Sequence, residues 1–402
     1  MTEVTVVSTQ RNRRKREPQI HNAALLGMVR PVMAAMMLGA LLAGCAAPTG
    51  IRFAQTPTIS LETESIVVAT TRVPKGHADF TGERAGKLQY ASYQVSIPPG
   101  HKIGEIEWPR SKPDPKKYFA VASTKPLTGS SMFSAQINAD LAAGSSPQAR
   151  GKREATLFAH GYNTDFSEAL YRAAQIKHDF DMTAPMALFS WPSAGSPGLY
   201  IYDRDSVKAS RDQLVSVIKA LAASKVDHIT LMAHSLGTEL LMESLRQVAL
   251  ANNGRLPSKI QSVVLISPDI DMDVFNSQLA TIRTLPKNFV ILVSARDRAL
   301  QLSSLLAGDT GRVGNSLDET RIKREGITVV DVTGFDGGDS MNHMTAVTAP
   351  SLVALLKGVA MSGKKTAVFE NSNDANLPGT LINTATLPLD LVVKTTRTIF
   401  DQ

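Results

Sequence analysis

Hydrophobic and polar positions along the chain form two recurring patterns. Short apolar runs rich in β-branched residues are separated by longer stretches in which apolar side chains recur at helical spacing. We expect strands over the short runs at 66–70, 88–97, 118–123, 154–159, 186–189, 228–232, 262–266, 289–294 and 327–332. Because strands that alternate with helices form βαβ units, the pattern predicts an α/β fold, a mostly parallel central sheet flanked by helices.

The stretches with helical spacing divide the chain further. We expect helices over 165–180, 206–223, a stretch that begins at Thr238, and 349–359, with another helical stretch inside 124–153. Together these elements predict a single domain over residues 65–360. Residues 45–64 are rich in Thr, Pro and Ala and are interpreted as a tether. Residues 361–402 show little periodicity before Leu387 and are interpreted as a loosely ordered C-terminal tail.

Residues 1–44 have the features of a secretory signal. An apolar run from Pro31 to Ala43 follows the basic residue Arg30 and leads into Leu42-Ala43-Gly44-Cys45. The run is too short for a comfortable membrane-spanning helix. Its end resembles the lipobox of bacterial lipoproteins, in which the cysteine is lipidated and becomes the mature N-terminus. The resemblance implies a lipid anchor on Cys45 in the bacterial cell envelope, and Ala46 after the cysteine points to the outer membrane, facing the periplasm.

Two points about this segment stay open. A plain signal peptide with an incidental cysteine would leave the protein without an anchor. Residues 1–27 are long, polar and basic for such a signal, and a true start at Met28 would make them a start-site artefact. Cys45 is the only cysteine of the chain, so the sequence excludes an intramolecular disulfide.

The net charge gives no support to a nucleic-acid partner. The chain carries a formal charge of +7 at pH 7. Six basic and two acidic residues precede Cys45, so this leader contributes +4 of the charge and the rest of the chain +3. A charge this small over the remaining residues is not the electrostatic footprint of a nucleic-acid-binding domain. The oligomeric state is not indicated by any feature of the sequence.

The segment Ala233-His234-Ser235-Leu236-Gly237 is the strongest candidate for chemistry. It lies between the apolar run 228–232 and the helical stretch that begins at Thr238. A serine between small residues on a sharp strand-to-helix turn is how a hydrolase exposes a nucleophile. Ala233 departs from the G-x-S-x-G pattern, but it keeps a small side chain in the crowded turn. Taken by itself, the segment would also suit an ordinary strand–helix junction.

A serine nucleophile needs a histidine as base and a carboxylate that orients the histidine. Asp297 follows the apolar run 289–294, and His343, the only histidine after residue 235, follows the run 327–332. The order Ser, acid, His is that of α/β-hydrolases. Asp269, at the end of the preceding run, is an alternative acid that could instead serve as a turn or helix-cap carboxylate. We favour Asp297 because the acid usually follows the second strand after the nucleophile.

Acyl transfer also needs backbone N–H groups aimed at the oxyanion of the tetrahedral intermediate. Leu236, directly after Ser235 and at a helix N-terminus, would supply one donor. The other would come from the backbone of Tyr162 in His160-Gly161-Tyr162-Asn163-Thr164, an H-G loop after the apolar run 154–159. The same letters would also suit a tight turn before a helix.

Several segments together resemble the α/β-hydrolase family known as domain of unknown function 900. They are 160–164, Phe189-Ser190-Trp191-Pro192-Ser193, 233–237, Ala69-Thr70-Thr71-Arg72, Ser96-Ile97-Pro98-Pro99 with His101 and Gly104, and Pro268-Asp269-Ile270-Asp271. The resemblance covers about residues 65–357. It implies a serine hydrolase of the α/β-hydrolase fold that needs no metal or organic cofactor. Such proteins are often bacterial lipoproteins, which agrees with the context of Cys45.

The expected activity is hydrolysis of carboxylic esters or other acyl groups through an acyl-Ser235 intermediate, as in esterases and lipases. The expected substrate is a small molecule or a lipid that carries an acyl group, and the segment 191–205 is expected to line one side of an open site. Trp191, Tyr200 and Tyr202 in this segment could equally pack in the core or at its rim. Amide cleavage or acyl transfer would use the same residues. A function of a different class would be a non-catalytic envelope lipoprotein that uses the hydrolase fold as a binding platform.

Overall fold

The structure, a computed structural model, describes residues 50–54, 62–110, 112–144, 153–308, 311–335, 339–362 and 393–395. These residues belong to the compact unit Ala47–Gln402. The predicted signal segment with Cys45 and most of the predicted tail lie outside them. Among the helices that are described, none has the length and apolar character needed to cross a membrane.

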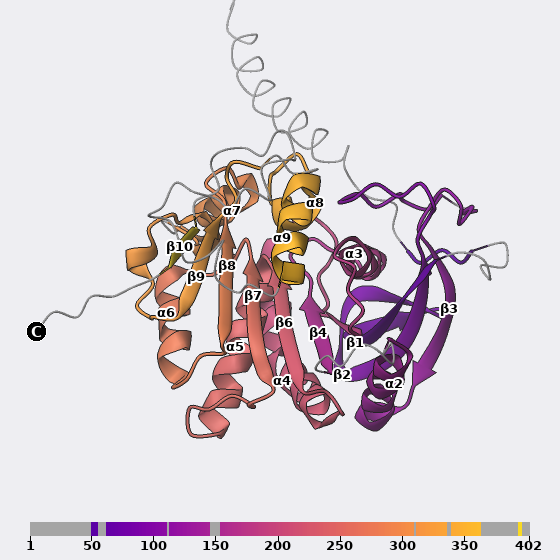
Figure 1. The fold of residues 1–402 in the computed structure, drawn as a ribbon, viewed down its shortest axis with the longest axis horizontal. Helices are drawn as coiled ribbons and strands as arrows, with labels where there is room; N and C mark the ends of the chain where they lie inside the picture. The colour runs from indigo at the N-terminus through magenta and orange to yellow at the C-terminus, as the bar shows by residue number, and fades with distance from the viewer. Residues whose placement is uncertain are drawn as a thin grey trace, which may run out of the picture. The chain divides into compact units, whose positions relative to one another are not determined.

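One sheet, in which parallel pairing dominates, runs through the described residues (Figure 1). Its strand order is β10-β9-β8-β7-β6-β4-β5-β1-β2-β3. The strands are β1 (Thr63–Lys75), β2 (Asp79–Ser96), β3 (Ala120–Leu127), β4 (Glu154–Ala159), β5 (Met186–Ser190), β6 (His228–His234), β7 (Ile260–Ile266), β8 (Asn288–Val293), β9 (Ile327–Asp331) and β10 (Val393–Thr395). Pairing is parallel from β1 through β5, β4, β6, β7 and β8 to β9, and antiparallel for β2, β3 and β10 at the two edges. The predicted α/β fold with a mostly parallel sheet is confirmed.

Helices cover both faces of this sheet (Figure 1). They are α2 (Gly129–Gly144), α3 (Phe166–Asp179), α4 (Tyr200–Ala223), α5 (Leu236–Ala251), α6 (Met272–Thr281), α7 (Arg298–Ala307), α8 (Thr345–Thr348) and α9 (Pro350–Ser362). Successive strand residues face opposite sides, so Val67 packs into the cluster under α2, α4, α5 and α6, whereas Val68 packs into the cluster under α3, α8 and α9. Burial on both faces explains why the central strands read as unbroken apolar runs.

Several elements differ from the sequence-based expectation. The helices α6, α7 and α8 were not predicted, and β1 and β2 are longer than the predicted runs 66–70 and 88–97. Helix α4 begins at Tyr200, six residues before the predicted start at 206, so the segment 191–205 is helical in its second part. The start was missed because the residue that precedes the helix, Leu199, offers no side-chain cap. In the tail, β10 pairs antiparallel with β9, with Val393 opposite Val330. A three-residue strand has no periodicity of its own, and only its distant partner defines it.

The topology determines where the candidate chemistry lies. The strands β6, β7, β8 and β9 run parallel, so their carboxyl ends share one edge of the sheet. Ser235 directly follows β6, Asp269 follows β7 and Asp297 follows β8, while His343 comes after β9. In open α/β sheets this edge is where ligands bind.

Candidate active site

The Ser235 turn has an unusual backbone conformation. Ser235 lies between β6 and α5 with φ 52° and ψ −127°, a region that residues other than glycine rarely adopt. Its N–H donates to the carbonyl oxygen of Ile266 at 2.9 Å, and its carbonyl accepts the N–H of Thr238 at 2.9 Å. These bonds hold the strained turn against the end of β7. A serine in such a turn is the arrangement that exposes a hydroxyl at the top of a hydrolase sheet.

Two glycines let the H-G loop approach this turn. A Cβ on Gly161 would lie 2.9 Å from the Cβ of Ser235, closer than real carbon atoms approach. A Cβ on Gly237 would overlap the carbonyl oxygen of His160. The loop that carries Tyr162 therefore packs directly against the Ser235 turn. The fully buried side chain of Ala233 fits the apolar core at this point, so the departure from G-x-S-x-G is accommodated.

His343 and Asp297 are bonded to each other. The Nδ1 of His343 donates to the Oδ2 of Asp297 at 2.7 Å, while the Oδ1 of the same carboxylate accepts the N–H of Leu300 at 3.0 Å and caps α7. Asp297 is fully buried, and the His343 side chain is 14% exposed. Burial by itself lowers the pKa of His343, but the charge and hydrogen bond of Asp297 outweigh it and raise the pKa above its usual value.

The segment around His343 is tied to the Ser235 turn through His234. The Nε2 of His234 donates to the carbonyl oxygen of His343 at 3.1 Å, and the two imidazole centroids lie 4.5 Å apart. Burial, followed by the nearby charge of His343, holds the pKa of His234 well below its usual value, so this ring is neutral. Over the described part of the chain, no hydrogen bond joins the Ser235 hydroxyl to the His343 ring. Contacts of this kind are often long without substrate and shorten in the complex.

Asp269, the alternative acid, lies in a separate buried polar cluster. Its carboxylate accepts the Ser303 hydroxyl at 2.6 Å and the Tyr200 hydroxyl at 3.0 Å, and it pairs with the Nε of Arg312 at 3.2 Å. Its own N–H donates to the carbonyl oxygen of Ser235 at 3.3 Å. Asp269 therefore joins α4, α7 and the Ser235 turn, and the carboxylate bonded to His343 is that of Asp297.

The two candidate oxyanion donors flank Ser235. Leu236 is the first residue of α5 and is fully buried, and the first N–H groups of a helix have no partner inside the helix. Tyr162 belongs to the loop that Gly161 brings against Ser235. The Tyr162 hydroxyl donates to the carbonyl oxygen of Pro197 at 2.5 Å, and its ring packs edge-on against Tyr200 with centroids 5.3 Å apart. Its side chain thus anchors the loop, while its backbone N–H is the candidate donor.

The structure decides the place of Trp191 and gives Asp339 a role that the sequence analysis missed. Trp191, expected either to line the site or to pack in the core, is fully buried and stacks on the ring of His160 at 4.9 Å, so it belongs to the core. Asp339 accepts the N–H of His343 at 3.0 Å and the N–H of Met344, which fixes the backbone of the histidine. An aspartate a few residues before a histidine in a Gly-rich loop is the local signal for such a turn.

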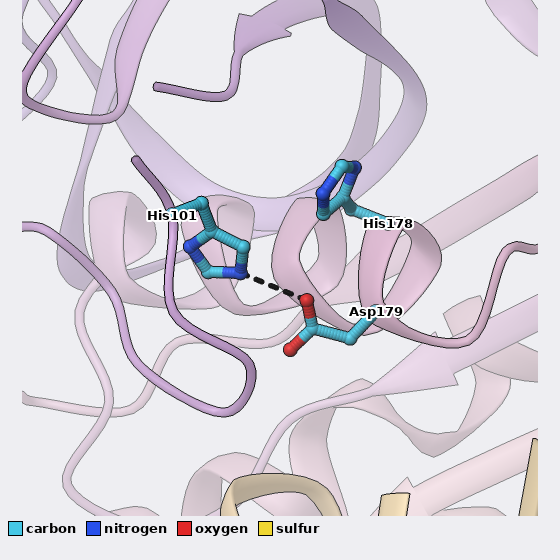
Figure 2. Close-up of side chains that lie close together, drawn as sticks. All are labelled: His101, His178 and Asp179. Carbon is cyan, nitrogen blue, oxygen red and sulfur yellow. Dashed lines mark hydrogen bonds and ion pairs between the residues drawn. The ribbon is translucent and has the colours of Figure 1, made fainter. Parts of the chain in front are cut away.

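A group of side chains that could hold a metal lies elsewhere, beside the C-terminal end of α3. His101, His178 and Asp179 place their ligand atoms within 4.8 Å of one another (Figure 2). Glu62, Glu64 and His178 form a second such group. The two ring nitrogens of His101 are each 2.8 Å from a carboxylate, Nδ1 from Glu107 and Nε2 from Asp179.

The charge of His101 argues for an ion-paired cluster over a metal site. Burial by itself lowers the pKa of His101, but the hydrogen bonds and charges of Asp179 and Glu107 raise it to about 9. At neutral pH both nitrogens then donate protons, and neither lone pair is open to a cation. The cluster fits a structural role, since Asp179 also accepts the N–H of Gly104 at 2.7 Å.

A family model described as an alpha/beta hydrolase of unknown function, DUF900, matches residues 138–359. No curated protein matches the chain. Similar solved structures include a dienelactone hydrolase from Anabaena variabilis ATCC 29413, at 12% identity and a TM-score of 0.33 over 68% of this chain and 90% of that one. An esterase from Pyrobaculum calidifontis is similar at 11% identity and a TM-score of 0.34, covering 72% of this chain and 86% of that one. A carboxyl esterase 2 from the mycorrhizal fungus Tuber melanosporum is similar at 12% identity and a TM-score of 0.36, covering 79% and 91%.

The family match begins at residue 138, so the expected motif residues at 69–72 and 96–104 lie outside it. Within it lie the H-G loop, the Ser235 turn, both candidate acids and His343. Because the match spans more than half of the 402 residues, the chain belongs to the DUF900 family of α/β-hydrolases.

Proposed function

We propose that the protein is a serine hydrolase that cleaves carboxylic esters or other acyl groups through an acyl-Ser235 intermediate. The observation that carries the proposal is the 2.7 Å bond from the Nδ1 of His343 to buried Asp297, on the sheet edge where Ser235 occupies a strained turn. Membership of an α/β-hydrolase family supports hydrolysis as the reaction class.

The proposed acylation step uses the open nitrogen of His343. The Ser235 Oγ attacks the acyl carbonyl carbon while the Nε2 of His343 takes the hydroxyl proton. Asp297 holds the imidazole in the tautomer with Nδ1 protonated and stabilises the imidazolium. The N–H groups of Tyr162 and Leu236 bind the oxyanion. The bond from the carbonyl carbon to the leaving oxygen then breaks, and the leaving alcohol takes the proton from Nε2.

Deacylation repeats these steps with water. His343 removes a proton from the attacking water, a second tetrahedral intermediate forms, and the acid departs as Ser235 regains its proton. An amine leaving group or an acceptor alcohol in place of water would give amide cleavage or acyl transfer with the same residues.

Exposed aliphatic side chains beside the site support an acyl substrate with a hydrocarbon part. Leu199 and Ile201 at the start of α4 are 48% and 63% exposed. On α7, which begins directly after Asp297, Leu302, Leu305 and Leu306 are 50%, 79% and 58% exposed. The Tyr200 hydroxyl and the Ser303 hydroxyl are 2.7 Å apart, so these two elements adjoin. Apolar surface beside an active site favours binding of apolar groups.

A lipid anchor on Cys45 completes the proposal. Cys45 lies outside the described residues, and the support comes from the Leu42-Ala43-Gly44-Cys45 context after a short apolar run. Lipid chains on this cysteine would hold the enzyme on the envelope membrane, facing the periplasm, without a spanning helix. Metabolic labelling with a palmitate analogue should mark the wild-type protein and leave Cys45→Ala unmarked. Labelling that persists in Cys45→Ala would contradict the anchor.

A fluorophosphonate probe tests the central step. The wild-type protein should form a covalent adduct and hydrolyse p-nitrophenyl esters, and Ser235→Ala should do neither. Ser267→Ala is the matched control, because Ser267 also ends a central strand, with φ 45°, and is equally well buried. It should keep both the adduct and the turnover. A folded wild-type protein that takes up no probe and cleaves no ester would instead support the non-catalytic binding platform.

A further inference from the structure

Arg72 on β1 is a fully buried cation that the proposed chemistry does not use. Its side chain has no exposed surface, and it lies where the register between β1 and β2 shifts. Burial lowers the pKa of Arg72 to about 10, so the guanidinium is charged at neutral pH. A buried charge is costly unless it is paired and hydrogen-bonded. The hydrogen-bond acceptors of the Arg72 guanidinium therefore show which segments of the chain it positions.

The guanidinium donates to the H-G loop, to the end of β5 and the segment after it, and to β2. Its acceptors are the Ser190 hydroxyl at 2.9 Å, the carbonyl oxygens of Ser193 at 2.8 Å, Thr164 at 2.7 Å and Thr81 at 3.2 Å, and the Nε2 of His160 at 3.3 Å. His160 can accept because it is neutral, since burial and then the Arg72 charge lower its pKa to about 3. Thr164 and His160 are the two ends of the H-G loop.

Asp203, in the first turn of α4, holds the same loop from another element. It is fully buried, and its carboxylate accepts the N–H of Asn163 at 3.1 Å, the Ser193 hydroxyl at 2.6 Å and the N–H of Ala194 at 2.8 Å. The Ser193 hydroxyl in turn accepts the N–H of Thr164 at 3.0 Å. Arg72 and Asp203 therefore share Ser193 and bind adjacent residues of the loop.

The loop they hold is the one that carries the candidate oxyanion donor. Asn163 has φ 54°, a conformation that needs support in a residue other than glycine. The Thr164 hydroxyl donates to the carbonyl oxygen of Tyr162 at 3.1 Å, which fixes the peptide plane that follows Tyr162. Gly161 meanwhile packs against Ser235. An oxyanion donor acts only when it is already in place, and a misplacement of about 1 Å can cost about 10²-fold in rate.

We propose that Arg72 and Asp203 are positioning residues that fix the backbone N–H of Tyr162 where the oxyanion of the acyl-transfer intermediate forms. This inference rests on the proposed hydrolase function. A buried ion-bonded network is often no more stable than apolar residues of the same volume, so stability alone gives little reason for it. A network that orders one catalytic loop explains why both buried side chains bond to residues of the loop 160–164 and share Ser193.

The test compares Arg72→Lys and Ser193→Ala with the matched control Arg84→Lys. Arg84 lies on the adjoining strand β2 and donates to the Ser206 hydroxyl and the Tyr202 carbonyl, without contact to the H-G loop. The full-length protein is assayed for kcat and KM with a p-nitrophenyl ester and for the affinity of a trifluoromethyl ketone, which forms a tetrahedral adduct with a serine nucleophile.

A positioning role predicts a loss confined to the tetrahedral state. For Arg72→Lys we expect kcat to fall about 10²-fold and for Ser193→Ala about tenfold, with KM within about threefold of wild type. The affinity of the ketone should fall by the same factor as kcat/KM. Arg84→Lys should stay within about twofold of wild type in all three quantities.

Three outcomes would overturn the inference. In the first, Arg72→Lys and Ser193→Ala melt at lower temperature but bind the ketone as the wild type does, which leaves the network a merely structural role. In the second, Arg84→Lys loses as much activity as Arg72→Lys. In both cases the wild type still turns over, so the proposed hydrolase function survives. In the third, the wild type neither cleaves the ester nor binds the ketone, and both proposals fail. If Arg72→Lys does not fold, Ser193→Ala, which removes one hydroxyl, decides the question.

Discussion

Two buried histidine–carboxylate groups differ in how many ring nitrogens they occupy. His101 contacts Glu107 through Nδ1 and Asp179 through Nε2, each at 2.8 Å. His343 contacts Asp297 through Nδ1 at 2.7 Å, and within the described residues its Nε2 forms no hydrogen bond. Both side chains are largely buried, 4% and 14% exposed. Both histidines therefore share burial and a carboxylate partner, and they differ in that His343 keeps one ring nitrogen open, as the proposed role of a general base requires.

The number of carboxylates bonded to each ring also accounts for the different charges of His101 and His343 at neutral pH. Two carboxylates raise the pKa of His101 to about 9, and a ring that is charged at neutral pH can cross-link segments but cannot accept a proton there. Two carboxylates and one imidazolium make an ion-paired cluster beside α3. A single bonded carboxylate orients His343 and leaves it able to cycle between neutral and charged forms, as a general base must.

The largest effect that would separate the two histidines is on turnover. His343→Gln should lower kcat by about 10⁵- to 10⁶-fold, because the glutamine cannot take the Ser235 proton. His101→Gln should lower kcat by less than about tenfold at a temperature where both variants are folded, since His101 contacts no proposed catalytic group. The measurement is p-nitrophenyl ester turnover with fluorophosphonate titration of active sites. Equal losses in the two variants would end the distinction.

The next effect concerns the carboxylates. Asp297→Asn should lower kcat by about 10⁴-fold, because an amide in place of the carboxylate favours the wrong imidazole tautomer. Asp269→Asn disturbs its contacts with Ser303, Tyr200 and Arg312 and should cost less than about 10²-fold. The comparison is made by kcat of the two purified variants, with melting temperatures as the control for folding. A larger loss in Asp269→Asn would reassign the acid.

The features of the candidate site that could be predicted from the sequence are those formed by residues close together along the chain. The turn at Ser235 could be predicted because its small residues and flanking strand and helix are contiguous. Asp297 and His343 could be placed on the same sheet edge because each follows a strongly apolar run. The choice between Asp297 and Asp269 rested on chain order, and only the folded chain shows which carboxylate His343 contacts.

Non-local features had no comparable signal. The contact of His101 with Asp179 joins residues 78 apart, and that of Arg72 with Thr164 joins residues 92 apart. Neither pair has a spacing that periodicity detects. His101 and Arg72 stood out only as parts of family motifs. Their function became apparent from the acceptors around them, because a buried charge must be explained by its partners.

A smaller effect is expected on stability, and it concerns His101. The folded pKa of His101 is about 9 against an ordinary value of 6.5, so its contribution is fully present below pH 6.5 and is lost as pH rises towards 9. This shift corresponds to at most roughly 3 kcal/mol. Denaturant unfolding at pH 6 should show His101→Gln less stable than wild type by up to that amount, with the difference shrinking between about pH 6.5 and 9.

The matched control for stability is His228→Gln. His228 also faces a carboxylate, Glu154 at 3.3 Å, but that carboxylate is exposed. Exposed pairs contribute at most about 1 kcal/mol, so His228→Gln should change the free energy of unfolding only slightly. A pH-independent loss in His101→Gln would mean that packing, and not the two ion pairs, accounts for its effect.

The finest distinction lies in the pH dependence of catalysis. Burial alone would lower the pKa of His343, but Asp297 first, then Asp269 and Asp339, raise it. The protonated ring cannot accept the Ser235 proton, so kcat/KM should rise with pH, with a midpoint above the ordinary value of 6.5. Removing the main negative charge in Asp297→Asn should move the midpoint of the residual activity to lower pH, whereas His101→Gln should leave it in place.

A wild-type midpoint below 6.5 would indicate that Asp297 does not control the charge of His343. A midpoint that moves in His101→Gln would show that the two histidines are coupled, and the difference between an open and an occupied nitrogen would then not be enough to explain their roles.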